Sequence, residues 1–224
     1  MPGSTGLLRK LSGLVYVGAM SEPSDFDLLE RWRAGDRAAG NTLFTRHFRS
    51  LFRFFRTKVT DEIAEDLTQT SFLACVDGRD KFCNASSFRT YLFAIGRNQL
   101  FMHFRKRGRQ EAVTAFETVS MADLGAGPST LVAAKAEQRL LLRALRRIPV
   151  DFQIAIELYY WEGVPTAEIA VVLEVPEGTV RSRLTRAREH LAKQMRALAE
   201  SPELAESTVA DFERWAQSLR GAFD

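Results

Sequence analysis

Apolar residues recur at three- and four-residue steps through nearly all of residues 25–107, and again through residues 138–196. This spacing places them on one face of an α-helix, whereas a half-buried strand requires strict alternation. We therefore predict an all-α fold with two small helical domains, at residues 25–110 and 138–196. Residues 111–137 are acidic, show no sustained period and contain two glycines and a proline, which predicts a flexible linker between the domains.

The two ends of the chain fall outside these domains. Residues 1–24 are interrupted by glycine and serine, and we expect a disordered leader, with Met1 or Met20 as the translation start. A weak signal peptide is the alternative interpretation of this stretch. Residues 197–224 form an acidic tail with near-helical apolar spacing. Two interpretations of the tail stay open: a helix that packs back on the second domain, or an acidic helix that covers a basic DNA-reading surface.

The composition argues against several classes of function. The two cysteines, Cys75 and Cys83, form no CxxC pair, and the three histidines are scattered, so we predict no metal, no cofactor and no disulfide framework. No apolar run approaches the roughly 18 residues of a membrane span, and there is no Gly-rich phosphate loop or Gly-x-Ser-x-Gly elbow. These features predict a cytoplasmic protein that is not an enzyme, takes no small-molecule substrate and does not insert into membranes.

The formal net charge of +3 conceals two basic blocks. Residues 1–110 carry 18 Lys and Arg against 11 Asp and Glu, and residues 138–196 carry 10 against 7. The linker and the tail are both acidic. Two basic blocks separated by an acidic segment are typical of two domains that face nucleic acid.

A helix-turn-helix pattern lies in the second basic block. A short helix at residues 166–173 and a turn at residues 174–176 precede a basic helix at residues 177–196. Pro176 and Glu177 suit the first turn of that basic helix. The N-terminal half of such a helix enters the major groove, where one bidentate Arg–guanine contact is worth about 1–3 kcal/mol of discrimination. The side chains free to enter the groove are Thr179, Arg181, Ser182, Thr185 and Arg186.

Two helices of the first block carry less specific signals. On the helix at residues 61–77, Asp66, Gln69 and Phe72 lie three apart and form a stripe that a partner helix can contact, although Phe72 also suits a core position. The helix at residues 88–109 interleaves basic and aromatic residues, as a surface for phosphates and unstacked bases does. The alternative is that its aromatic residues are core and its basic end complements the helix dipole.

Other polar residues are expected to begin helices or to face solvent. The predicted N-caps are Asp36, Ser86 or Ser87, and Asp151. After Asp36, one helix carries arginines opposite its apolar face, which we expect to form a solvated surface; they are Arg46, Arg49, Arg53 and Arg56.

Four segments together resemble a known family. GDRAAGNTLFTRHFRSLFRFF, DLTQTSFLACV, SSFRTYLFAIGRNQLFMHFRKR and EGVPTAEIAVVLEVPEGTVRSRLTRARE are similar, in this order, to regions two and four of the sigma-70 family. Over about residues 25–196 the chain resembles a sigma factor of the extracytoplasmic-function (ECF) group. The resemblance implies a non-catalytic subunit that binds core RNA polymerase, recognises and helps melt promoter DNA in a stress or envelope response, and has an anti-sigma factor as a further partner.

The resemblance also implies three sets of site residues by position. Those implied to bind core polymerase are Asp66, Gln69 and Phe72. Those implied to contact the minus-ten element are Asn84, Ser86, Ser87, Arg89, Arg97, Asn98, Arg105 and Lys106. Those implied to contact the minus-thirty-five element are Thr179, Arg181, Ser182, Arg183, Thr185 and Arg186. The sequence departs from the family at Thr70, where an acidic residue is usual.

The alternative function is a stand-alone helix-turn-helix transcriptional regulator that acts without core polymerase, with the first domain for effector binding or dimerisation. The DLTQTSF motif and the basic–aromatic helix favour the sigma factor, since a stand-alone regulator needs neither. We also expect the two domains of the free protein to pack on each other through the linker and to hide both DNA-binding surfaces.

Overall fold

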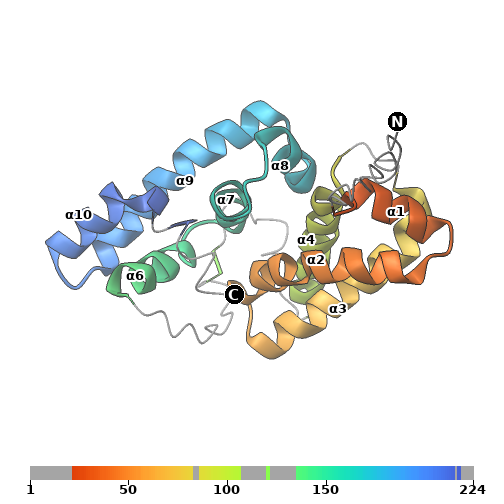
Figure 1. Ribbon diagram of the computed structural model, residues 1–224. Helices are drawn as coiled ribbons and strands as arrows, with labels where there is room; N and C mark the ends of the chain where they lie inside the picture. The colour runs from red at the N-terminus through yellow and green to blue at the C-terminus, as the bar shows by residue number, and fades with distance from the viewer. Residues whose placement is uncertain (1–21, 83–85, 107–119, 122–134, 215, 218–224) are drawn as a thin grey trace, which may run out of the picture.

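The computed structural model describes residues 22–82, 86–106, 120–121, 135–214 and 216–217. These residues form helices joined by short turns (Figure 1). Among them, the β pairing consists of one isolated antiparallel bridge between Ser120 and Pro149. The all-α prediction is therefore confirmed.

The first domain packs its helices in chain order, each against the next. The helices are α1 (Asp25–Arg33), α2 (Arg37–Arg56), α3 (Asp61–Gly78), the short η1 (Arg79–Lys81) and α4 (Phe88–Lys106). Their shared core consists of fully buried apolar side chains, among them Leu43, Leu51, Phe55, Leu92 and Leu100. The three- and four-residue spacing of the sequence is thus satisfied by helix–helix packing.

Side-chain caps set where two of these helices begin. The Asp36 carboxylate accepts hydrogen bonds from the backbone N–H groups of Ala38 and Ala39, so the predicted cap of α2 is confirmed. Of the two serines considered for α4, Ser87 is the cap, because its Oγ accepts the N–H of Thr90 at 3.2 Å. Each cap satisfies backbone donors that the first helical turn leaves unpaired.

The second domain contains the predicted helix-turn-helix. Its elements are α6 (Ala136–Leu145), α7 (Val150–Ile156), the π-helical turn η2 (Glu157–Trp161), α8 (Thr166–Leu173) and α9 (Glu177–Leu198), and α10 (Pro202–Ala210) follows in the tail. Between α8 and α9 the chain turns at Glu174, which adopts the left-handed conformation with φ +56°. The inward face of α9 is buried along its length at Val180, Leu184, Ala187 and Leu191.

The acidic tail packs on the second domain. Helix α10 contacts α9 and α6, and Glu206 pairs with Arg196 at 2.7 Å near the C-terminal end of α9. Beyond α10, the Phe212 ring lies 5.0 Å from the Tyr160 ring in η2. The residues predicted to read DNA are about ten positions earlier on α9, or about 15 Å along the helix axis. Helix α10 therefore packs back on the second domain, as the first of the two interpretations of the tail predicts.

Two expectations about individual residues are wrong. Arg53 was expected on a solvated face but is 3% exposed, because Glu162 of the second domain pairs with it. Asp151 does not cap α7: Pro149 holds the cap position, and the Asp151 carboxylate turns toward Arg97 and Arg183. In both cases an arginine–carboxylate pair determines where the side chain lies, in place of the solvent exposure expected for Arg53 and the helix cap expected for Asp151.

Most of the predicted linker and leader lies outside the described residues. Within the linker the structure describes Ser120 and Met121, which are both buried, and residues 135–137, where α6 already begins at Ala136. Ser120 forms the bridge to Pro149, so the linker contacts the second domain at this point.

Candidate nucleic-acid interface

The outer face of α3 presents the stripe predicted from DLTQTSF. Asp66 and Gln69 are exposed, whereas Phe72 is half-buried. The Phe72 ring lies 4.7 Å from the Phe44 ring and 6.4 Å from the Phe48 ring, both on α2. Phe72 therefore has both of its predicted roles, since it packs against α2 and also contributes to the surface beside Asp66 and Gln69.

Sequence reasoning missed the apolar part of this surface. Leu73 is 63% exposed on α3, Val76 lies one turn further along, and Phe48 is exposed on the neighbouring α2. Residues 66, 69, 73 and 76 follow the three- and four-residue spacing of one helix face, which is the signal that identifies Leu73 and Val76 as its continuation. An exposed apolar surface bordered by polar residues marks an interaction site.

Helix α4 holds most of the residues predicted to contact the minus-ten element, but their surroundings differ. Asn98, Arg105 and Lys106 are exposed. Arg97 is 7% exposed; its guanidinium lies 4.2 Å from the centre of the Phe101 ring and 3.3 Å from Oδ1 of Asp151. Asn84 lies outside the described residues, and Ser86 is half-buried in the turn before the helix.

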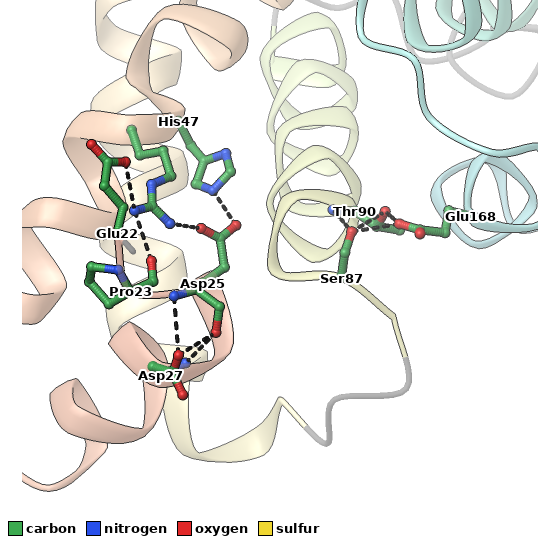
Figure 2. Close-up of polar contacts among 10 residues, drawn as sticks. Glu22, Pro23, Asp25, Asp27, His47, Ser87, Thr90 and Glu168 are labelled. Carbon is green, nitrogen blue, oxygen red and sulfur yellow. Dashed lines mark hydrogen bonds and ion pairs between the residues drawn. The ribbon is translucent and has the colours of Figure 1, made fainter. Parts of the chain in front are cut away.

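The N-terminal end of α4 contacts α8 of the second domain (Figure 1). Figure 2 shows Ser87 and Thr90 pointing at the Glu168 carboxylate, with 2.5 Å between Ser87 Oγ and Glu168 Oε2. Between these two hydroxyl residues in the chain, the Arg89 guanidinium donates to the backbone carbonyl of Glu162. Three predicted minus-ten residues, Ser87, Arg89 and Arg97, are thus bonded to the second domain.

Buried ion pairs join the two domains. Lys58 and Glu157 are almost fully buried and form one pair, and Arg53 donates twice to Oε1 of Glu162, at 2.8 and 3.0 Å. Burial lowers the pKa of Lys58, and the facing Glu157 carboxylate opposes that shift. Arg146 of the second domain donates to the backbone carbonyl of Thr57, the residue before Lys58, at 3.3 Å. A charge buried this deeply requires a partner, so these contacts are specific to this domain arrangement.

The recognition helix α9 presents its predicted face to solvent. Arg181, Ser182, Thr185 and Arg186 are exposed, and Thr179 is half-buried. Arg183 differs, since it is 3% exposed and its Nη1 lies 3.2 Å from Oδ2 of Asp151. The reason is its position on the helix face that carries Val180 and Leu184, both buried.

The expected packing of the two domains is confirmed, but the expectation that it hides both DNA surfaces is wrong. Glu168 of α8 engages Ser87, the carbonyl of Glu162 before α8 engages Arg89, and Asp151 of α7 engages Arg97. The recognition helix packs through its inward side and keeps four predicted residues exposed, namely Arg181, Ser182, Thr185 and Arg186. Among the described residues there is no cluster of metal-ligating side chains and no helix long and apolar enough to span a membrane.

Comparisons with known proteins match both domains. The family model for Sigma-70 region 2 matches residues 43–110, and that for Sigma-70, region 4 matches residues 138–191. The ECF RNA polymerase sigma factor SigM of Mycobacterium tuberculosis is 34% identical over 180 residues, which cover 80% of this chain and 88% of that protein.

Two solved structures have a similar fold. CnrH, in complex with the cytosolic domain of CnrY, aligns with a TM-score of 0.58 and 24% identity over 78% of this chain and 99% of that one. The sigma factor RpoE of Bartonella quintana, in complex with the anti-sigma factor NepR, aligns with a TM-score of 0.53 and 23% identity over 70% and 95%. The chain therefore belongs to the sigma-70 family as an ECF sigma factor, a transcription initiation factor, not an enzyme, that directs RNA polymerase to promoters.

Proposed function

We propose that the two domains divide promoter recognition and polymerase binding between them. The outer face of α3, with Asp66, Gln69 and Phe72, binds core polymerase. Helix α4 and the loop before it contact the minus-ten element through the eight residues named for it above, and the N-terminal half of α9 reads the minus-thirty-five element. We propose domain boundaries at residues 25–110 and 138–196 for these two activities.

The observation that best supports this proposal is the exposure of two separate surfaces. Asp66 and Gln69 are exposed on the first domain, beside the apolar residues Leu73 and Val76. Arg186 is exposed on the second domain, on the half of the recognition helix that a major groove accepts. A stand-alone regulator needs the second surface alone, whereas a sigma factor needs both.

The test uses purified core RNA polymerase and a pooled genomic-fragment template. We expect the protein to co-elute with core and to direct initiation at discrete start sites. Asp66→Ala and Gln69→Ala should weaken co-elution, while Arg186→Ala should leave co-elution unchanged and lose promoter choice. If the protein binds duplex DNA specifically but does not bind core polymerase, the proposed role of the first domain is wrong.

We further propose that the protein acts in the cytoplasm and is regulated by an anti-sigma factor. Of the proteins with a similar fold, the sigma factor RpoE was solved with the anti-sigma factor NepR, and CnrH was solved with the cytosolic domain of CnrY. A pull-down from the native cell extract with the full-length chain as bait tests this proposal. Recovery of core polymerase subunits with no further stoichiometric partner would contradict it.

A further inference from the structure

We propose that four carboxylates of the second domain, Asp151, Glu157, Glu162 and Glu168, hold the free protein in a closed form; they are called the interdomain carboxylates below. In this form Asp151 and Glu168 occupy the place of promoter DNA on the first domain. This inference rests on the proposed role of α4 in binding the minus-ten element. It concerns how that role is prevented until polymerase and promoter are engaged.

Both domains contribute hydrogen bonds that position the contact between Lys58 and Glu157. The Lys58 ammonium has three N–H donors, and its partners are the Phe54 carbonyl at 2.7 Å, Thr57 Oγ1 at 2.9 Å and the Glu157 carboxylate. The other oxygen of Glu157 accepts from Gln153 Nε2 at 2.8 Å, within the second domain. The carboxylate is thus oriented by its own domain and completes the coordination of a cation on the other.

Asp151 is also oriented by its own domain. One of its oxygens accepts from Arg183 of the recognition helix, and the other accepts from Arg97 of α4. A single carboxylate therefore joins one residue predicted for the minus-thirty-five element to one predicted for the minus-ten element. Each of these three side chains is less than 10% exposed, so the contact excludes a competing phosphate.

The remaining two residues, Glu162 and Glu168, contact α2 and the entrance of α4. Glu162 binds Arg53 through its side chain and Arg89 through its carbonyl. Glu168 binds Ser87 at the start of the helix. A carboxylate and a phosphate present the same charge and the same kind of acceptor to arginine and hydroxyl groups, so each replaces the other at such a site.

The closed form and DNA binding by Ser87, Arg89 and Arg97 are therefore mutually exclusive. Opening leaves Lys58, Arg53 and Arg97 without these carboxylates, and removing one partner of a buried pair is strongly unfavourable unless water or another anion replaces it. When a binding-competent state is only fractionally populated, the apparent affinity of its ligand falls by that fraction. The interdomain carboxylates thus lower the affinity of the free protein for DNA at α4.

The test reverses two of these charges in the full-length protein. In Glu157→Lys/Glu162→Lys, cations face Lys58 and Arg53, so the closed form is prevented. The matched control, Glu174→Lys/Glu189→Lys, has the same net charge, and both of its positions are exposed. Small-angle X-ray scattering measures the radius of gyration, which is about 17 Å for a compact chain of this length. Circular dichroism and thermal melting verify that both variants keep their helices.

We expect the test variant to be more extended than the control at equal helix content. It should also bind a fluorescein-labelled single-stranded 20-mer of mixed sequence at least about tenfold more tightly than the control does. Equal radii of gyration and equal DNA affinities for the two variants would overturn the proposal. So would a wild-type protein as extended as the test variant.

A charge exchange tests the assigned partners and covers the case in which the first variant folds poorly. Arg53→Glu alone should open the protein, and Arg53→Glu/Glu162→Arg should close it again. An exchange variant that remains as extended as Arg53→Glu would overturn the pairing. Co-elution with core polymerase is measured separately for each variant, so a failure of polymerase binding, which would refute the proposed function, is distinguishable from a failure to close.

Discussion

Helices α4 and α9 are the two arginine-bearing helices predicted to contact DNA, and the structure treats them differently. On α4, Arg89 and Arg97 are bonded to groups of the second domain. On α9, Arg181 and Arg186 remain exposed, and Arg181 pairs within its own helix with Glu177 at 2.6 Å. The comparison teaches that composition identifies a nucleic-acid surface, whereas the acidic groups packed against it decide whether that surface is accessible.

The difference between α4 and α9 also affects the order in which the protein can bind polymerase and the two promoter elements. The face of α3 proposed to bind polymerase and the face of α9 proposed to read DNA are accessible in the closed form, but the entrance of α4 is not. On the proposals above, core polymerase and the minus-thirty-five element can engage the closed protein, and contact with the minus-ten element follows opening. The predictions below test each side of this comparison.

The largest expected effect concerns the ion pairs that join the first domain to the second. Lys58→Met leaves Glu157 buried without its cation, which is expected to destabilise the described arrangement by roughly 3–5 kcal/mol. Urea unfolding measures this loss, and Arg49→Met, at an exposed position on α2, the helix that precedes Lys58, is the control. Adding Glu157→Leu to Lys58→Met should recover most of the loss, since a buried apolar pair replaces a buried ion pair at little cost. A loss no larger than that of the control would contradict the role of the pair.

The exposed side is tested at the recognition helix. Arg186→Ala should weaken binding to a promoter fragment selected by transcription with the wild-type protein, by about 1–3 kcal/mol, because a bidentate base contact is lost. The polymerase holoenzyme is used, and affinity is measured by titration at one fixed salt concentration. Lys193→Ala, on the same helix beyond the groove-facing half, serves as the control. Equal losses for the two variants would mean that Arg186 contributes charge alone.

A third prediction concerns whether the acidic tail covers the exposed face of the recognition helix α9. Phe212 packs against Tyr160, and the tail contacts the C-terminal end of α9, so Phe212→Ala should destabilise the second domain by roughly 2 kcal/mol. Deleting residues 202–224 should likewise lower the melting temperature without increasing promoter binding. A rise in promoter-directed transcription on deletion would instead support the interpretation that the tail covers the DNA-reading surface.

The smallest effect concerns an ion pair near the entrance of α4. Burial alone would raise the pKa of Asp25, but hydrogen bonds and charges from His47 and Arg46, each 2.6 Å away, outweigh it and lower the pKa (Figure 2). A carboxyl with a lowered pKa in the folded state stabilises the protein above its ordinary pKa, and this contribution is lost as the pH falls through the lowered value.

Asp25→Asn should therefore cost about 1 kcal/mol at pH 7, and this cost should shrink as the pH falls below the ordinary pKa of aspartate and through the lowered pKa of Asp25. Urea unfolding across this pH range measures the difference, with the exposed Asp77→Asn as the control. A difference that stays constant with pH would show that the carboxylate charge is not what stabilises this contact.

Local features were predictable from the sequence because their causes are local. The spacing of apolar residues along each helix, the Asp36 cap and the turn between α8 and α9 all depend on residues within a few positions of one another. The exposed set on α9 and the Asp66–Gln69 stripe followed from the same periodicity.

The tertiary structure alone decided which charged residues are accessible. The sequence predicts a solvated face for Arg53 and a DNA-binding surface for Arg97. Their partners, Glu162 and Asp151, lie 109 and 54 positions away in the chain. Helical periodicity identifies the side of a helix on which a residue lies, but not what packs against that side. The physical reason is that burying an arginine is unfavourable without an opposing carboxylate, and only the folded arrangement of both domains brings that carboxylate within hydrogen-bonding distance.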